Sequence, residues 1–332
     1  MEVQLLKRHF AAAWYVLTVI LPVILRTGRR PVVFSRFAGL GDILCTFPAA
    51  LELKQRHPAA TFIYNCAPAF ACLPRMGGVT ERVTHLEHAG LIGYWYRWLL
   101  AGYYDFGSDD DQFSADHGEL FIKGYARRNG VAVSGEHPRL RCEPAVIDRV
   151  KSVLTNRGWK NEPLILIHPG PTWPVKEWPR ESWAALVQAM QKRGKIFQLG
   201  ATAGHFSNVS GAEPPAAPGA VSLVNQLSVE ESLALVSLAD LFVGIDSGLL
   251  HAAVCFQVPA VGIWGATSPQ FLFAESELRH FVVSRAECQG CHHRFPRLHH
   301  ITGCPYDIRC MKEISVAEVL RTSLKNFSSS SS

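Results

Sequence analysis

The chain has 332 residues, 48% of them hydrophobic, and a formal net charge of +5. This length predicts two domains, and the apolar content is ample for two hydrophobic cores. The charge is mild and forms no dense basic stripe, which argues against a nucleic-acid-binding protein. The nine cysteines are an odd number, which is against a complete disulfide framework and favours a reducing compartment.

The first element is an uncharged run, Phe10 to Leu25, that has no polar face and has basic residues on both sides. It is shorter than the roughly 20 residues needed to cross a bilayer without tilt. It is therefore a membrane anchor or shallow insertion, a helix buried on the protein, or a signal peptide, although no small-residue cleavage site follows it. The basic flanks suit anionic lipid, so we expect residues 1–28 to hold the protein, peripherally or by an anchor, at the cytoplasmic face of the inner membrane.

Residues 29–144 alternate strand and helix signals, as in a Rossmann-like domain. The predicted elements are strands over 31–37, 61–67 and 82–88 and helices over 48–57 and 118–131. The aromatic segment 94–106 is ambiguous, because a helix lining a cleft, core packing and membrane-facing packing all fit it. The acidic segment 108–112 is interpreted as a solvated loop rather than a metal site.

After a Gly- and Pro-containing approach to a linker, 132–144, the pattern begins again in residues 145–327. Here the predicted helices are 145–159, 179–194, 228–239 and 248–257, and the predicted strands are 163–170, 195–201, 241–246 and 259–265. Ser228 and Glu231 have the spacing of a capping box. Two such series predict two doubly wound α/β domains, whose ligands bind beyond the carboxyl ends of the strands. Residues 328–332 are expected to be a disordered tail.

Gly39 and Gly41 turn the chain from the first predicted strand into a helix, where free N–H groups favour an anion. Asp42 already places a carboxylate there, so it is either a helix cap or a catalytic group. In the second half, Lys176 stands in a proline-rich loop, from which it could reach a diphosphate. A solvated lysine is the alternative.

The stretch "GIDSGLLH" ends a predicted strand at Asp246 and opens a helix at Ser247 and Gly248. It offers N–H groups, a hydroxyl and a positive helix end to a phosphate, and His251 follows one helical turn after Ser247. A simple helix cap followed by a core histidine is the alternative interpretation.

Three motifs occur in order over residues 30–310: "R…GLGDIL…P", "HPG……K.WP" and "DSG..H.A…..P..G.WG.T.P". Together they resemble glycosyltransferase family 9, the ADP-heptose:lipopolysaccharide heptosyltransferases. The resemblance implies a GT-B architecture, in which two Rossmann-like domains face each other across a cleft. It also implies inverting, metal-independent transfer of a sugar, heptose by the family's precedent, from a nucleotide-sugar donor to a lipopolysaccharide-core or related glycolipid acceptor.

The resemblance also implies roles for particular residues. Asp42 would be the general base, on an acceptor-side turn with Gly39 and Gly41. The residues implied to bind the donor are Lys176, Thr172, Asp246, Ser247, Gly248 and His251. No cofactor would be required, and ADP-heptose or another nucleotide sugar would be the donor. Family members often carry an acidic residue after the strand equivalent to 195–201, and its absence from 200–208 leaves a different nucleotide or sugar open.

Cys288, Cys291, Cys304 and Cys310 cluster in the segment 288–310, where a zinc site, a disulfide and reduced packing cysteines all remain open. A zinc-dependent nucleic-acid module built on them is one alternative function. The others are a nucleotide-sugar epimerase of GT-B fold and a non-catalytic carbohydrate-binding protein. The expected partners are the sugar donor, the glycolipid acceptor and the cytoplasmic membrane surface, with no nucleic acid.

Overall fold

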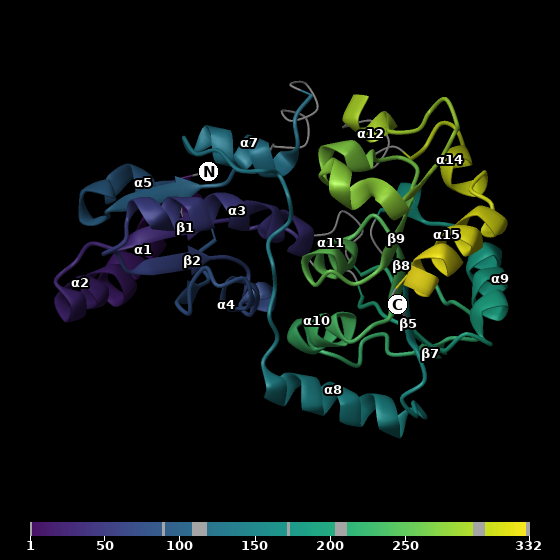
Figure 1. Ribbon diagram of the computed structural model, residues 1–332. Helices are drawn as coiled ribbons and strands as arrows, with labels where there is room; N and C mark the ends of the chain where they lie inside the picture. Colours follow the sequence, from purple (N-terminus) through teal and green to yellow (C-terminus); the bar gives the residue numbers. More distant parts are fainter. Residues whose placement is uncertain are drawn as a thin grey trace. The chain divides into compact units, whose positions relative to one another are not determined.

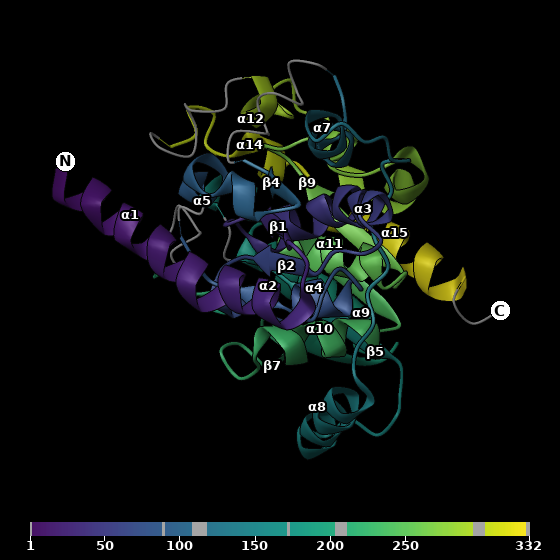
Figure 2. The same ribbon diagram turned by 90° about the vertical axis from the view of Figure 1, so that its left-hand side faces the viewer.

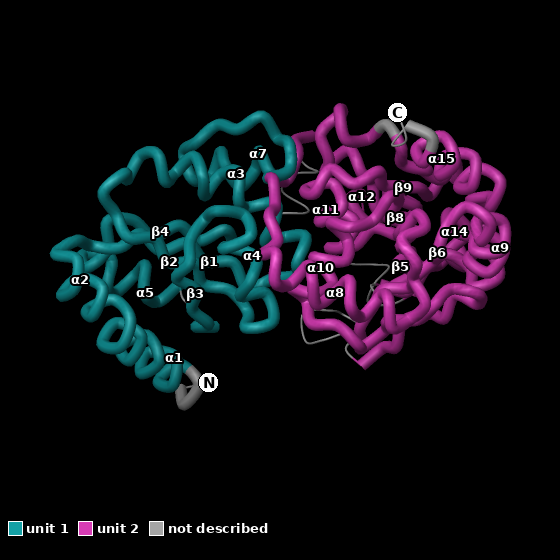
Figure 3. The backbone as a smooth tube through the Cα atoms, turned by 60° about the horizontal axis from the view of Figure 1, so that its bottom comes forward, with its two compact units in different colours: residues 1–110, 122–138 teal, residues 111–121, 139–332 magenta. Residues whose placement is uncertain are grey.

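The structure is a computed structural model that describes residues 2–87, 90–107, 118–170, 173–202, 211–294 and 303–329. The chain divides into two compact units, residues 1–110 with 122–138 (unit 1) and residues 111–121 with 139–332 (unit 2), which Figure 3 colours separately. Each unit contains one sheet, and all the strand pairs that the structure describes are parallel. The predicted α/β fold class is confirmed (Figure 1).

Unit 1 is built on a four-stranded sheet in the order β3-β2-β1-β4. Its strands are β1 (Val32–Ser35), β2 (Phe62–Asn65), β3 (Val83–Thr84) and β4 (Gly102–Asp105). After the N-terminal segment, its helices and helical turns are α3 (Leu40–Arg56), η2 (Pro68–Phe70), α4 (Leu73–Met76), α5 (Gly90–Trp95), η3 (Arg97–Leu99) and α7 (Phe121–Arg128). Every residue of β1 is buried, as expected for a central parallel strand covered on both faces.

The ambiguous aromatic segment 94–106 contains the end of α5, the turn η3 and the strand β4. β4 pairs with β1 in parallel, with Ser35 opposite Asp105. This strand is hard to recognise in the sequence, because it begins shortly after the helical turn η3 and both elements are rich in aromatic residues. Helix α3 starts eight residues before the predicted helix and contains Pro48, while Ile43, Leu44 and Phe47 are buried.

The N-terminal helical segment comprises α1 (Glu2–Tyr15), a π-helical turn η1 (Val16–Ile20) and α2 (Leu21–Thr27). It ends at Gly28, whose left-handed backbone (φ +66°) suits glycine at a helix terminus. One face of the segment is buried on unit 1 and forms a core cluster with residues of the sheet. Residues Leu5–Thr27 are long and apolar enough to cross a membrane by length and composition.

Unit 2 contains a six-stranded sheet in the order β10-β9-β8-β5-β6-β7. Its strands are β5 (Leu164–His168), β6 (Lys195–Gln198), β7 (Val221–Ser222), β8 (Leu241–Ile245), β9 (Ala260–Trp264) and β10 (Val282–Val283). Counted from β5, this is the doubly wound dinucleotide-fold order, in which the direction of winding reverses between β5 and β8.

The helices and helical turns of unit 2 are α8 (Pro144–Asn156), η4 (Pro174–Lys176), α9 (Arg180–Met190), α10 (Val229–Ser237), α11 (Gly248–Cys255), η5 (Pro269–Phe271), η6 (Glu275–His280), α12 (Cys291–Arg294), α14 (Arg309–Lys312) and α15 (Val316–Ser329). The predicted capping box of Ser228 and Glu231 is present at the start of α10.

Helix α15 packs against α9 and the central strands, so the end of the chain belongs to the core of unit 2. It extends to Ser329, two residues into the segment that the sequence assigned to a disordered tail, and residues 330–332 lie outside the described part. The loop before α15 is fixed by Trp178, whose Nε1 donates to the Ile314 carbonyl over 3.0 Å.

Candidate active site

The strands β5, β8 and β9 are parallel neighbours, so their carboxyl ends lie at one edge of the unit 2 sheet. They end at His168, Ile245 and Trp264, and the segments that follow carry residues of the second and third sequence motifs. The winding reversal between β5 and β8 opens a crevice at this edge in doubly wound folds. Topology therefore brings residues that are 70 to 90 positions apart in the sequence to one place.

Lys176, Asp246 and Thr267 form a buried polar cluster at this edge. The Lys176 Nζ lies 2.6 Å from Asp246 Oδ2, and their side chains are only 13% and 6% exposed. The Thr267 hydroxyl donates to the same carboxylate oxygen over 2.7 Å. Burial alone would raise the pKa of Asp246, but the charge and hydrogen bond of Lys176 outweigh it and lower that pKa, with help from Thr267 and His251.

The same lysine lies over an aromatic ring. Its Nζ is 4.0 Å from the ring centroid of Trp173, a cation–π distance. The indole also lies beside His292, whose ring centroid is 4.6 Å away. Lys176 is therefore held between a carboxylate and an indole, and the alternative of a solvated lysine is wrong.

Ser247 and Gly248 begin α11, as the sequence predicted. Ser247 is the N-cap residue, but its side chain makes no capping hydrogen bond, and its buried Oγ has no partner among the described residues. The first N–H groups of a helix also lack intrahelical acceptors. His251 is buried one turn later and stacks at 4.5 Å on Phe273. A hydroxyl and a helix N-terminus are thus available beside Asp246.

His168, at the end of β5, is a core residue rather than part of this cluster. Its Nδ1 donates to the Leu199 carbonyl over 3.1 Å, and burial lowers its pKa to about 4. The imidazole is therefore neutral at neutral pH and connects the ends of β5 and β6.

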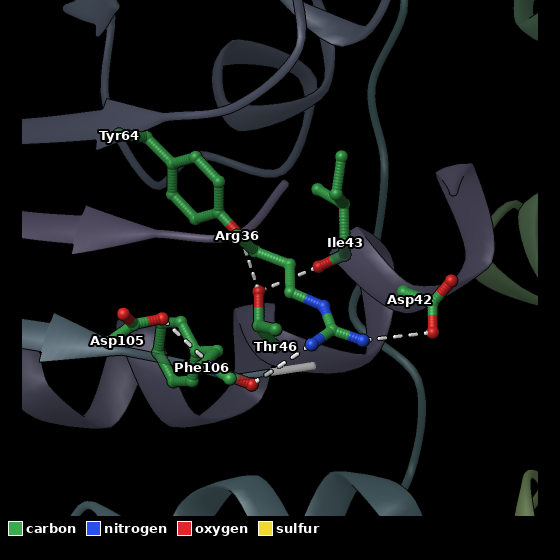
Figure 4. A network of polar contacts seen from close by, with 8 residues as sticks. Arg36, Asp42, Ile43, Thr46, Tyr64, Asp105 and Phe106 are labelled. Atoms are coloured by element: carbon green, nitrogen blue, oxygen red, sulfur yellow. Dashed lines mark hydrogen bonds and ion pairs between the residues drawn. The ribbon is translucent and has the colours of Figure 1, made fainter. Parts of the chain in front are cut away.

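In unit 1, Asp42 lies in the first turn of α3 and pairs with Arg36 from the end of β1 (Figure 4). The Arg36 Nη2 donates to Asp42 Oδ1 over 3.1 Å. A Cβ placed on Gly39 would lie 3.2 Å from the other Asp42 oxygen, so a side chain at position 39 would crowd the carboxylate. The N-cap residue of α3 is Gly39, so Asp42 stands at the third position of the helix.

Arg36 is buried and joins several elements of unit 1. Its Nη1 donates to the Phe106 carbonyl over 3.2 Å, and its guanidinium lies 5.3 Å from the Tyr125 ring centroid. Burial opposes its charge, but Tyr125 and Asp42 raise the pKa of Arg36 above its usual value. This permanent cation stabilises the ionised form of Asp42. β4 ends nearby at Asp105, whose carboxylate accepts from Gly107 N–H over 3.0 Å.

The four clustered cysteines of unit 2 come together around α12 and α14. All nine cysteines of the chain are free thiols. Burial raises the pKa of Cys310 to about 12, and the neighbouring Cys288, Cys291 and Cys304 contribute to the rise. Cys291 also shares a small apolar cluster with Cys304. These four thiols, from a 23-residue segment between Cys288 and Cys310, therefore lie in the same region of unit 2.

The structure groups most of the predicted site residues, and it adds some that the motifs did not single out. Lys176, Asp246, Ser247, Gly248 and His251 lie together in unit 2, whereas Asp42, Gly39 and Gly41 lie in unit 1. Thr172, the acidic segment 108–112 and residues 203–208 lie outside the described residues. The additions are Trp173 and two residues that the motifs contain without an assigned role, Arg36 in the first motif and Thr267 in the third.

A family model matches residues 130–301, more than half of the chain, and its description is glycosyltransferase family 9 (heptosyltransferase). The chain belongs to glycosyltransferase family 9. A curated relative, lipopolysaccharide heptosyltransferase 1 of Pseudomonas aeruginosa, is 28% identical over 134 residues. That match covers 39% of this chain and 36% of the relative, about a third of the relative's length.

Solved structures of family members share the fold. E. coli ADP-heptose lipopolysaccharide heptosyltransferase II aligns over 91% of this chain and all of its own, with a TM-score of 0.66 at 14% identity. The iron-containing dodecameric glycosyltransferase TibC of enterotoxigenic E. coli aligns over 90% of this chain and 76% of its own, with a TM-score of 0.66 at 19% identity. TibC has also been solved in complex with ADP-D-β-D-heptose.

Proposed function

We propose that this family 9 protein is an inverting glycosyltransferase that moves heptose from ADP-heptose to a lipopolysaccharide-core or related glycolipid at the cytoplasmic face of the inner membrane. The observation that carries the proposal is the buried Lys176–Asp246–Thr267 cluster beside the start of α11, at the winding reversal of unit 2. Family membership supplies the reaction class. The relatives that act on lipopolysaccharide or bind ADP-heptose supply the substrates.

The donor diphosphate would bind at the start of α11. Lys176 offers an ammonium, Ser247 a hydroxyl and the helix N-terminus its N–H groups, which together stabilise the charge that develops on the leaving ADP. These groups belong to the chain itself, so the proposed transfer needs no metal ion. Asp246 orients Lys176 rather than contacting the diphosphate, because two negatively charged groups repel each other.

The general base would be Asp42. Its carboxylate accepts the proton of the acceptor hydroxyl while that oxygen bonds to the anomeric carbon and the bond to the diphosphate breaks. Attack opposite the leaving group inverts the configuration. An ionised carboxylate is required for this step, and the Arg36 guanidinium favours that form. Its weak basicity has to be offset by its position against the hydroxyl.

The test compares the carboxylates of Asp42 and Asp105, which stand near the carboxyl ends of the neighbouring strands β1 and β4 of unit 1. Asp42→Asn and Asp42→Ala should abolish ADP release in the presence of acceptor and leave ADP binding, measured by calorimetry, unchanged. Asp105→Asn is the matched control and should retain turnover. Normal turnover by Asp42→Asn would exclude the base assignment. Product formed from ADP-heptose without acceptor would identify an epimerase, and binding without turnover of any nucleotide sugar would identify a non-catalytic carbohydrate-binding protein.

A second proposal concerns a structural metal. Four thiols are the donor set that Zn²⁺ and iron accept in tetrahedral sites, and Cys288, Cys291, Cys304 and Cys310 are the residues that would hold the ion. They lie in the same region of unit 2, close enough for three of them to raise the pKa of the fourth, and one structural neighbour is described as iron-containing. A metal there would fix the loops around α12, which carries His292 beside Trp173. Metal analysis of the purified protein tests this.

A further inference from the structure

Large apolar side chains are exposed almost entirely on one part of unit 1. Among the described residues ten such side chains are exposed, and nine of them lie on the N-terminal helical segment or on α5 and η3. We call these nine the apolar patch: Leu5, Leu6, Phe10, Trp14, Leu17, Leu25, Tyr94, Trp95 and Trp98. The tenth is Tyr306 in unit 2. Exposed apolar side chains gathered in this way mark an interaction surface.

The helical part of the patch is a single stripe. Leu6, Phe10, Trp14 and Leu17 follow one another at intervals of three or four residues, which places them on one helix face. Their side chains are between 59% and 73% exposed. The stripe continues to Leu25, which is 83% exposed in the last turn.

The opposite face of the same segment belongs to the core of unit 1. Tyr15, Val16, Ile20 and Val23 are buried in one cluster with the strand residues Val33 and Ile63 and with residues of α5. The Tyr15 hydroxyl is 2.8 Å from Thr84 Oγ1 of β3. A helix that crossed a bilayer would have to leave this cluster and expose β1 and β2. The segment is therefore placed to lie along a surface rather than to pass through one.

Aromatic side chains extend the patch sideways. Helix α1 contacts α5 (Figure 2). The ring centroids of His9 and Trp95 are 6.1 Å apart. Tyr94, Trp95 and Trp98 are exposed on α5 and η3 in the same body. Tryptophan and tyrosine are the side chains that prefer the interfacial region of a membrane. Their gathering next to an apolar helix stripe favours a lipid surface over a second protein.

The charges around the patch match an anionic surface. Residues 1–31 contain five cationic side chains and one carboxylate, Glu2. The cations are Lys7, Arg8, Arg26, Arg29 and Arg30. Basic residues at the ends of an apolar helix attract anionic lipid headgroups.

We infer that the N-terminal helical segment and the α5–η3 aromatics form a monotopic docking surface for an anionic phospholipid bilayer, with the helix in the plane of the membrane. The occupant is lipid rather than a second copy of the chain, because interfacial aromatic side chains and basic residues at both ends of the helical segment accompany the apolar stripe. The idea that this surface gives the enzyme access to a glycolipid acceptor rests on the proposed function. The binding of lipid is independent of that function, and its test involves no sugar transfer.

The full-length protein should sediment with vesicles of phosphatidylcholine and phosphatidylglycerol in equal parts. The triple variant Phe10→Ser, Trp14→Ser, Leu17→Ser should lower the partition coefficient at least about 100-fold, because three large apolar side chains no longer enter the interface. All three side chains are exposed, so circular dichroism and the melting temperature should match the wild type. Tyr306→Ser is the control outside the patch and should bind as the wild type does.

Charge is tested separately with Arg29→Gln, Arg30→Gln. This pair should lower partitioning onto the anionic vesicles by about 20-fold and leave binding to pure phosphatidylcholine unchanged. The adjacent exposed cations of unit 2, in Lys192→Gln, Arg193→Gln, are the matched control. If both double variants lowered partitioning equally, the attraction to the vesicles would depend on net charge alone. That result would overturn the assignment of a specific surface.

Two further results would overturn the inference. An epitope tag placed before Met1 should be cleaved by protease added outside the vesicles, and protection of the tag would show that the helix spans the bilayer. Equal vesicle binding by the triple variant and the wild type would exclude the patch as the docking surface. A lipid-free dimer that the triple variant abolishes, with no vesicle binding by the wild type, would assign the patch to a second copy.

Discussion

Replacing Lys176 by methionine removes the cation that faces Asp246 while keeping an unbranched side chain against Trp173. In the wild type the ammonium lies 2.6 Å from the carboxylate, and both groups are almost inaccessible to solvent. The substitution leaves the buried Asp246 with the Thr267 hydroxyl as the hydrogen-bond donor that the structure shows. Breaking a buried ion pair from one side costs roughly 3–5 kcal/mol, because the remaining charge is left uncompensated.

For a domain of the size of unit 2, a loss of this order lowers the melting temperature by about 10 °C. The loss should shrink as the pH falls. In the wild type the pKa of Asp246 is lowered, so the stability contributed by its ionised form is present above the ordinary value near 3.8 and is lost as the pH falls through the folded pKa. In the variant, burial acts without the lysine and favours the protonated carboxyl.

The assay is differential scanning calorimetry of the wild type, Lys176→Met, and the double variant Lys176→Met, Asp246→Asn, at neutral and acidic pH. The double variant should recover most of the lost stability, since no buried charge remains unpaired. The double variant still lacks the ammonium, so its ADP binding should stay weaker than that of the wild type although its stability is restored. This difference separates the role of Lys176 in donor binding from its role in the fold. A melting temperature for Lys176→Met within about 1 °C of the wild type would refute the buried-charge argument.

Three other predictions follow from buried groups. His168→Asn keeps an N–H donor for the Leu199 carbonyl but cannot be protonated. The wild type should therefore lose about 3 kcal/mol of unfolding free energy as the pH falls from about 6.5 to about 4, and the variant should not. Urea titrations at the two pH values measure this, and equal losses in the two proteins would contradict it. Arg36→Lys offers one ammonium where two guanidinium nitrogens bind Asp42 and Phe106, so kcat should fall by up to about 100-fold with little change in the donor KM. Cys291→Ser should lower the zinc or iron content of the purified protein, and unchanged content would exclude the four-thiol site.

Much of the fold could be predicted because parallel strands are short, buried and apolar. The runs around β1, β5, β8 and β9 stand out in the sequence, and each is buried along its whole length. β4 could not be identified in the same way, since Tyr103 and Tyr104 are only half-buried and the strand begins shortly after the helical turn η3. Helix α15 was missed because its packing on α9 and the strands, rather than a local signal, makes it part of the core.

The candidate site was predictable where a motif marks a strand end, and less so where a partner comes from elsewhere in the chain. Lys176 and Asp246 are 70 positions apart, and only the neighbouring positions of β5 and β8 in the sheet bring them together. Arg36 stands in the first motif, but its pairing with Asp42 depends on the exit of β1 beside the first turn of α3. Spacing along the sequence carries no information on such contacts between elements.

The contacts of Lys176 are compatible with the proposed binding of a donor phosphate, although the lysine is already paired. An ammonium has three N–H donors. Asp246 accepts one, and the face of the Trp173 ring takes up another direction, so one donor direction remains for a phosphate oxygen. The lysine–aspartate pair carries no net charge, and the remaining attraction for a diphosphate has to come from the α11 N-terminus and the unpartnered Ser247 hydroxyl. Donor affinity should therefore depend on geometry at this edge more than on net charge, and Ser247→Ala should weaken ADP binding without the loss of stability expected for Lys176→Met.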